Sequence, residues 1–217
     1  MSTPGRIRGP VAALLVLACS AALGACGIAT DENPRALPVN TTTTTTPQSD
    51  AAGPERGIFW FVQAEALVPV LRPVSEFTPA EFVNTLLVPP ESSEGESLSN
   101  AIPAGTELLG TRTAGAIVEV DLSSEFEDVV GPGSSRAIGQ IVMTLTGLED
   151  VDAVRFAIAG EPIDVTSLDP DRGTVQVATP CDYSALLAEP LGETTRISPV
   201  QEQILVNKRS RVRDDCS

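Results

Sequence analysis

The segment from residue 27 to residue 56 limits which part of this chain can fold. It contains an unbroken run of threonines, Thr41–Thr46, together with four prolines and almost no large apolar side chain. A segment of this composition cannot bury enough apolar surface to offset its conformational entropy. We therefore expect residues 26–56 to form a disordered tether, and a folded core to begin at residue 57.

A leader precedes the tether. Arg6 and Arg8 stand before an apolar run over residues 11–23, and this run ends in Leu23-Gly24-Ala25-Cys26. A positive region followed by a short apolar region is typical of a secretory signal. The run has thirteen residues, which is too few to cross a hydrocarbon core about 30 Å thick as a helix.

The end of the apolar run resembles the lipobox of bacterial lipoproteins. In that family the cysteine thiol receives a diacylglycerol, the peptide is cut before this cysteine, and the new amino group is usually acylated. The resemblance implies a signal peptide over residues 1–25, acyl chains such as palmitate on Cys26, and a place on the extracytoplasmic face of the cell membrane. An earlier match that ends in Cys19 would leave a shorter apolar region, and the other alternative is a secreted protein whose Cys26 is an ordinary thiol.

The overall composition excludes several classes of function. The sequence has no histidine, and its 29 acidic and 14 basic side chains give a formal net charge of −15. Without histidine, Ser-His-Asp catalysis, Cys-His catalysis and His-ligated metal sites are excluded. The acidity argues against nucleic acid as a partner, because binding to phosphates requires clustered lysine and arginine.

The first half of the folded region predicts a strand and a helix. Ile58–Val62 is an aromatic and β-branched run typical of a strand. Residues 67–74 contain Pro69 and Pro73, so we expect an extended connection rather than a regular strand. Thr78 and the residues after it, Pro79 and Glu81, predict a helix start with an N-cap, a proline at the first position and a capping box, and Phe77 and Phe82 are placed for a hydrophobic staple.

The second half predicts a hairpin, a helix and a strand. Residues 107–112 and 116–122 flank a turn at 113–115, and the second of these strands alternates apolar and polar side chains. A helix follows residues 131–133, with Ser134 or Ser135 as its N-cap, and a strand covers 154–158. The order β-α-β-β-α-β predicts an α+β sandwich over residues 57–172, with two helices on one face of a mostly antiparallel sheet, ferredoxin-like in element order.

A C-terminal extension, residues 173–217, contains two cysteines. We expect a strand over 174–178, a short helix over 184–188 and a disulfide between Cys181 and Cys216. These two thiols are the ones left for pairing after cleavage of the leader and acylation of Cys26, and thiols oxidise outside the cytoplasm. Two free thiols are the alternative.

No catalytic constellation stands out, so we do not expect an enzyme, a cofactor or a metal. Two acidic clusters lie in short connections, where solvated loops are the simpler interpretation, and an acidic stretch at 169–173 lacks the distal Glu of a calcium loop and predicts a turn. The basic residues near the C-terminus adjoin Asp214 and Asp215 and predict a surface ion-pair cluster. The acidic clusters are Glu125, Glu127 and Asp128, and Glu149, Asp150 and Asp152; the basic residues are Lys208, Arg209, Arg211 and Arg213.

Several ordered motifs resemble GerMN-domain proteins of the sporulation and spore germination type. The resemblance covers roughly residues 57–165 and is carried by the strand at 58–62, the segments 67–74, 78–81, 101–106 and 118–126, and the runs Gln140–Thr146 and Val151–Phe156. It implies a noncatalytic protein-interaction module, often found on lipoproteins at the outer face of the membrane. Some members carry two copies of the domain, whereas this chain shows one.

Together these features predict a lipid-anchored adaptor or assembly factor of the cell envelope that binds an unidentified envelope protein. Ile58, Trp60 and Val62 point to one side of the first strand and are the candidate interaction surface, unless the C-terminal extension covers them, which we favour. The alternative function is a lipoprotein that binds a small ligand, either a glycan or a lipid, and it would need an apolar pocket.

Overall fold

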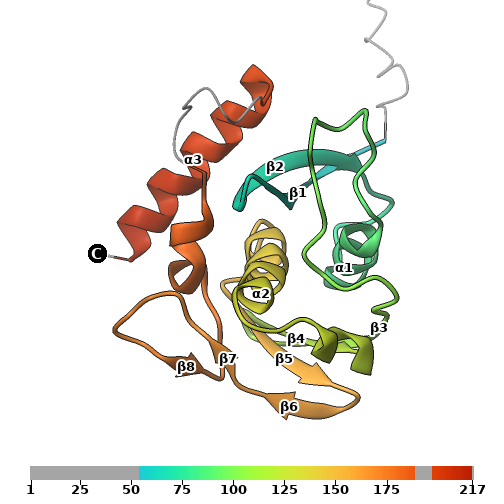
Figure 1. Cartoon of the computed structure of the whole chain (residues 1–217), viewed down its shortest axis with the longest axis vertical. Coiled ribbons are helices and arrows are strands. Elements are labelled where there is room, and N and C mark those ends of the chain that lie inside the picture. The colour runs from blue at the N-terminus through green and yellow to red at the C-terminus, as the bar shows by residue number, and fades with distance from the viewer. Residues whose placement is uncertain (1–53, 189–196, 217) are drawn as a thin grey trace, which may run out of the picture. The chain divides into compact units, whose positions relative to one another are not determined.

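An antiparallel hairpin begins the folded region of the computed structural model, which describes residues 54–188 and 197–216 (Figure 1). β1 (Arg56–Gln63) pairs with β2 (Ala66–Pro73), with Trp60 opposite Pro69. The turn between them uses Ala64 and Glu65, both at positive φ. The leader, Cys26 and nearly all of the tether lie outside the described residues.

The expectation of an irregular connection over residues 67–74 was wrong, because the prolines occupy the outer edge of the pair. The side-chain amide of Gln201 donates to the Pro69 carbonyl oxygen at 2.8 Å, so the backbone polar positions of Pro69 point away from β1. A missing N–H at that edge removes no hydrogen bond of the ladder. Pro73 follows Pro69 on β2 at an even spacing, so its backbone polar positions point to the same edge.

A four-stranded sheet forms the second β layer, in the order β3-β4-β5-β6. It consists of β3 (Leu108–Ala114), β4 (Ile117–Leu122), β5 (Ala153–Ile158) and β6 (Glu161–Ile163). Only the β4–β5 pair is parallel. The α+β class, the mostly antiparallel sheet and the predicted hairpin are confirmed, but β1 does not join this sheet, because β2 pairs with one of its edges and side chains of α2 bond to Trp60 at the other.

Two helices lie between the hairpin and the four-stranded sheet. α1 (Pro79–Leu87) contacts β1 and β3, and α2 (Pro132–Leu145) contacts β1 and β5 (Figure 1). Both helices therefore cover one face of the sheet, as predicted, and the β1–β2 hairpin covers their other side. The short 3-10 helix η2 (Ser124–Asp128) follows β4.

The starts of these helices follow local rules. At α1, the Thr78 hydroxyl accepts from the Glu81 amide at 3.3 Å, and the Phe77 and Phe82 rings are 5.6 Å apart, which confirms the N-cap and the staple. The Glu81 carboxylate reaches back to Ser75 instead of to Thr78. α2 begins with Gly131 as its N-cap, not a serine, because Pro132 already has the φ of a first helical residue.

The C-terminal extension is part of the same compact unit. It contains β8 (Thr174–Val175), the 3-10 helix η3 (Pro180–Leu186) and α3 (Pro199–Asp215), and β8 pairs with β7 (Val165–Thr166), which precedes the extension. The predicted strand is shorter and the predicted short helix begins earlier than expected. α3 was not predicted, although Ser198, Pro199 and Gln201 form a capping box with proline at the first position, which is a signal visible in the sequence.

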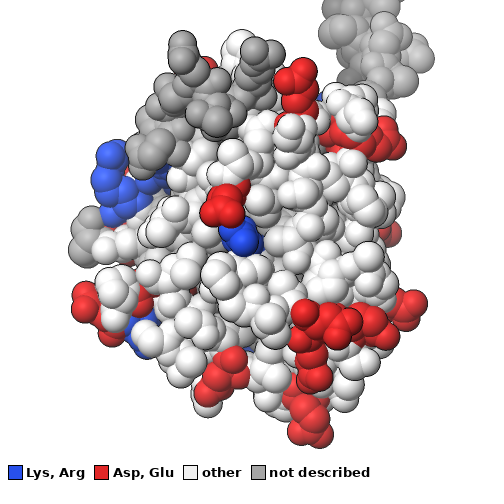
Figure 2. All heavy atoms as spheres, in the orientation of Figure 1, with Lys and Arg blue, Asp and Glu red and all other residues white. Residues whose placement is uncertain are grey.

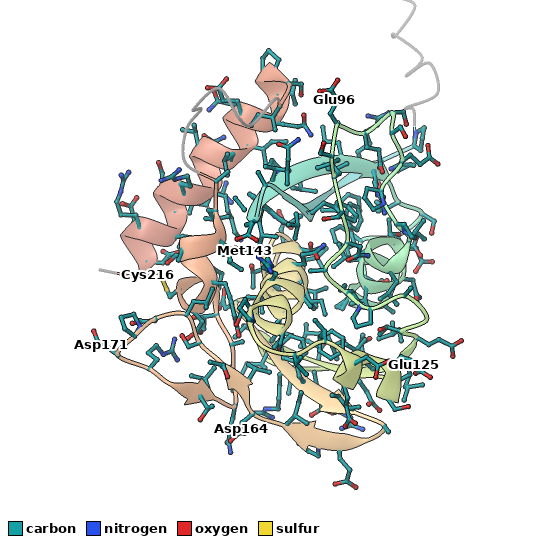
Figure 3. The ribbon with its side chains drawn as sticks, viewed as in Figure 1. Glu96, Glu125, Met143, Asp164, Asp171 and Cys216 are labelled. Atoms are coloured by element: carbon teal, nitrogen blue, oxygen red, sulfur yellow. A yellow bond between two sulfur atoms is a disulfide. The ribbon has the colours of Figure 1, made fainter. Side chains whose placement is uncertain are left out.

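α3 contacts η3 and β2, and the disulfide between Cys181 and Cys216 joins its end to η3 (Figure 3). The predicted disulfide is therefore confirmed. Within the described part of the chain, no helix combines the length and the apolar character needed to cross a membrane.

Replacing both Cys181 and Cys216 with serine should lower the free energy of unfolding by about 3–4 kcal/mol, because the two cysteines are separated by 35 positions and the bond restricts the unfolded chain. Urea denaturation with and without a reductant measures the effect. The reductant should shift the midpoint of the unmodified chain and leave the double variant unchanged; equal midpoints for both proteins in the absence of reductant would contradict the prediction.

Candidate functional site

The first strand is interior, so the proposed interaction surface on it was wrong. Trp60 is 2% exposed and Val62 is 8% exposed, whereas Ile58 is half-buried. The cause is the layered arrangement, in which α1 and α2 pack on the hairpin and α3 packs on β2. The extension contacts the hairpin through α3, which packs on β2.

Side chains of α2 hold the free edge of β1. The Trp60 amide donates to the Thr144 hydroxyl at 3.2 Å, and the Gln140 side-chain amide donates to the Trp60 carbonyl oxygen at 2.9 Å. Gln140 also accepts from the Ala101 amide. Both side chains are fully buried, and these bonds satisfy their polar groups. Gln140 and Thr144 lie one turn apart on an otherwise apolar helix face, a pattern that is visible in the sequence.

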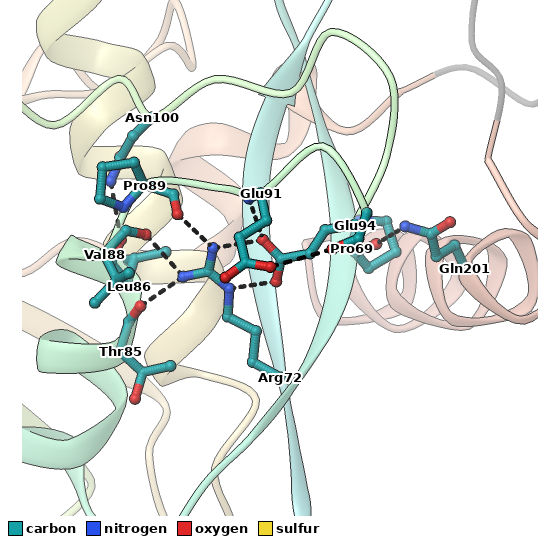
Figure 4. A network of polar contacts seen from close by, with 11 residues as sticks. Pro69, Arg72, Thr85, Leu86, Val88, Pro89, Glu91, Glu94, Asn100 and Gln201 are labelled. Atoms are coloured by element: carbon teal, nitrogen blue, oxygen red, sulfur yellow. Dashed lines mark hydrogen bonds and ion pairs between the residues drawn. The ribbon is translucent and has the colours of Figure 1, made fainter.

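Arg72 is a buried cation at the centre of the first half of the domain (Figure 4). Its guanidinium donates to both carboxylate oxygens of Glu94, each at 2.7 Å. It also donates to the carbonyl oxygens of Thr85, Val88 and Pro89 at 2.7–3.0 Å, where α1 ends. These carbonyls have no partner within the helix, and the positive charge complements the helix dipole.

The same guanidinium lies over an aromatic ring, 4.3 Å from the centroid of Phe61 on β1. Arg72 thereby connects both strands of the hairpin with the end of α1 and with the loop that carries Glu94. Glu94 is partly desolvated, which by itself would raise its pKa. The hydrogen bonds from Arg72 and from the Glu91 amide, with the nearby positive charge, outweigh that effect and hold the pKa of Glu94 below its ordinary value of 4.5.

The two acidic clusters are exposed, as expected for solvated connections. Figure 3 shows Glu125 pointing outward from the η2 side of the domain, and a hydrogen bond from the Ser123 hydroxyl lowers its pKa. Among the described residues, no group of three carboxylate or cysteine side chains is arranged to hold a metal ion. The stretch 169–173 is a turn, as predicted, in which the Asp169 carboxylate accepts from the Asp171 amide at 3.0 Å.

A buried carboxylate, that of Asp182, lies near the start of the C-terminal extension. Asp182 is fully buried and accepts from the Thr179 amide and hydroxyl at 2.7 and 2.9 Å. Arg172 Nη1 lies 3.0 Å from each of its carboxylate oxygens. The neighbouring Tyr183 is buried and donates to the Thr166 carbonyl oxygen, and burial, with the charge of Asp182, raises the pKa of Tyr183. This cluster fixes the start of η3, where Thr179, Pro180 and Asp182 form a capping box with proline at the first position, a signal visible in the sequence.

The basic residues near the C-terminus all lie on α3, and in the view of Figure 2 basic side chains gather over this helix. They do not form a simple surface cluster of ion pairs. Lys208 donates to the carbonyl and hydroxyl oxygens of Thr146 at the end of α2, and Arg209 donates to the Ala188 carbonyl oxygen. Two of the four therefore attach α3 to other parts of the fold.

Replacing Arg72 with methionine should lower the free energy of unfolding by about 3–5 kcal/mol, because the change leaves a half-buried carboxylate and three helix-end carbonyls without their donor. Chemical denaturation measures the loss. The matched control is Arg112→Met, which breaks an exposed ion pair with Glu119 and should cost about 1 kcal/mol or less. Equal losses in the two variants would contradict this role for Arg72.

The Arg72–Glu94 pair should also make the free energy of unfolding depend on pH. Because the pKa of Glu94 is lowered in the folded state, the stabilisation by this ion pair is complete above pH 4.5 and is lost as the pH falls below that value. The difference in unfolding free energy between the unmodified chain and Arg72→Met should therefore shrink between pH 5 and pH 3. A difference that stays constant across this range would show that the pair does not titrate in this way.

Comparison with known proteins identifies the domain. The family described as Germane, sporulation and spore germination, matches residues 58–164. The tandem GerMN domains of the sporulation protein GerM from Bacillus subtilis align at 16% identity and a TM-score of 0.49, covering 60% of this chain and 48% of that one. The first GerMN domain of the same protein aligns at 17% identity and a TM-score of 0.46, covering 58% of this chain and 95% of that one.

The chain thus spans about half the length of the tandem structure. No curated protein matches it. Residues 58–164 of this chain are thus a Germane domain.

Proposed function

We propose that this protein is a lipid-anchored, noncatalytic adaptor or assembly factor that binds other proteins at the extracytoplasmic face of the cell membrane. The observation that carries the proposal is the filled interior of the Germane domain. Its largest side chains, on β1, α1 and β5, are fully buried: Phe59, Trp60, Phe61, Phe82 and Phe156. Because the core is filled in this way, binding to another protein falls to the outer surface of the domain.

The outer face of the four-stranded sheet is the surface best suited to docking. α1 and α2 cover the inner face, where Val118, Val120 and Leu122 are buried. On the outer face, Arg112, Glu119 and Arg155 lie side by side in register across β3, β4 and β5.

The charges of this row favour an acidic partner segment. Arg112 pairs with Glu119 at 2.8 Å and its side chain is 79% exposed. Arg155 forms no ion pair with any residue in the described ranges. Two arginines around one glutamate leave a net positive row on a strongly acidic chain, and charge complementarity of this kind guides association and partner choice.

The proposed location rests on the leader and on the disulfide. The sequence Leu23-Gly24-Ala25-Cys26 supplies the acceptor for a lipid, and two or more acyl chains anchor a protein stably. The Cys181–Cys216 bond suits an oxidising compartment.

A photo-reactive amino acid at Ile117, on the outer face of the sheet, should form a cross-link to a specific protein in intact cells. The double variant Arg112→Glu, Arg155→Glu should abolish this adduct, because it reverses the charge of the row. The control position is Val206, exposed on α3. Adducts that arise only from Val206 would place docking elsewhere, and the lack of any adduct from several surface positions would argue against an adaptor.

Changing Cys26 to alanine should release the protein from membranes or stall removal of its leader, because the acyl chains have no other proposed attachment point. Detergent-phase partitioning of cell extracts measures this, with Cys181→Ala as the matched cysteine control that keeps the lipid. Unchanged partitioning of the Cys26 variant would refute the anchor without bearing on the docking face.

A further inference from the structure

A cleft of about 520 Å³ lies where the end of α2, the loop before β5, the start of η3 and the last turns of α3 meet. Part of its wall is apolar and is formed by Leu148, Val151, Pro180 and Val212. The disulfide partner Cys181 also lines it. Because both the Germane domain and the extension contribute residues, the cleft exists only when α3 is docked.

Two cations from α3, Lys208 and Arg211, line the polar part of the cleft. They are three residues apart on the helix and therefore lie on the same side of it. Lys208 donates to the Thr146 hydroxyl at 3.0 Å and to the Thr146 carbonyl oxygen at 3.3 Å, so part of its role is to cap α2. Arg211 is exposed, and its guanidinium has no hydrogen bond or ion pair with the parts of the chain that the structure describes.

The electrostatic environment of Lys208 is unfavourable without a counter-ion. Burial and, to a smaller extent, the positive charge of Arg211 lower the pKa of Lys208, the charge of Asp215 opposes both effects, and the net result is a pKa of about 8. A desolvated ammonium beside a second cation gains from any anion that enters between them. Asp152 and Asp215 also line the cleft and repel anions from the rest of it, so the favourable place is next to Lys208 and Arg211.

We propose that this cleft binds an oxyanion, a carboxylate or a phosphate, carried on a small apolar body. The anionic group lies between Lys208 and Arg211, and the apolar body lies on Leu148, Val151 and Val212. The cleft is formed by other residues than the docking face on the sheet, so the two proposals stand or fall separately.

Lys208 is the only lysine in the sequence, which allows a direct test. The full chain labelled with ¹³C-lysine shows one set of lysine side-chain resonances, and their pH titration reports the pKa of Lys208. Sodium phosphate, sodium acetate and sodium hexanoate are compared with sodium chloride at the same ionic strength. Binding of an oxyanion should move this pKa from about 8 toward the ordinary value of 10.5, because the anion favours the charged amine.

The two kinds of oxyanion and the apolar wall are tested by the same titrations. A shift of the Lys208 pKa in phosphate but not in acetate indicates a phosphate ligand, and a shift in acetate but not in phosphate indicates a carboxylate. Hexanoate should bind more tightly than acetate, by up to about fourfold for each methylene that becomes fully buried. Equal affinities for hexanoate and acetate would show that the apolar wall takes no part, and would overturn that half of the proposal.

Arg211→Gln should weaken binding at least about tenfold, since it removes one charge-assisted contact. The matched control is Arg213→Gln, which makes the same change on the same helix at a residue that does not line this cleft, and should bind as the unmodified chain does. A Lys208 pKa that is the same in chloride and in all three oxyanions would overturn the proposal. Undiminished binding by the Arg211 variant would do so as well.

Discussion

The buried guanidinium of Arg72 is the interaction on which the arrangement of the first half of the domain depends. It lies on β2, stacks on a ring of β1, closes the end of α1 and pairs with Glu94 in the following loop. A buried charge is stable only with its partners in place, so the hairpin, the helix and the loop have to adopt their positions together. The separate β1–β2 layer follows from this constraint, because it sets the hairpin against α1 rather than beside the four-stranded sheet.

The C-terminal extension completes the fold by a different means. The family region ends at residue 164, yet α3 bonds to β2 through Gln201, to the end of α2 through Lys208 and to η3 through the disulfide. The extension therefore covers an edge that a strand with free hydrogen-bonding groups would otherwise expose. It also forms one side of the cleft that contains Lys208 and Arg211, which neither part of the chain forms alone.

A filled core and two surface features of opposite kind define what this domain can do. In the two proposals, the outer face of the sheet presents Arg112 and Arg155 to a macromolecular partner, and the cleft presents the partly desolvated Lys208 to a small anion. Each presents a pair of cations on a chain with a net charge of −15. Local charge of this kind selects partners by complementarity rather than by general electrostatic attraction.

The sequence by itself determined the local elements and the cysteine pairing. Alternation over residues 117–122 predicted β4, the Thr78-Pro79 start predicted α1, and Cys181 and Cys216 predicted the disulfide, because these signals depend on near neighbours or on elimination. Only the tertiary structure decided that Trp60 is interior, that Pro69 lies at a strand edge, and that Arg72 and Lys208 are partly or fully buried. Those outcomes depend on which element packs on which, and partners far apart in sequence, such as Trp60 and Thr144 or Pro69 and Gln201, leave no periodic signal in the chain.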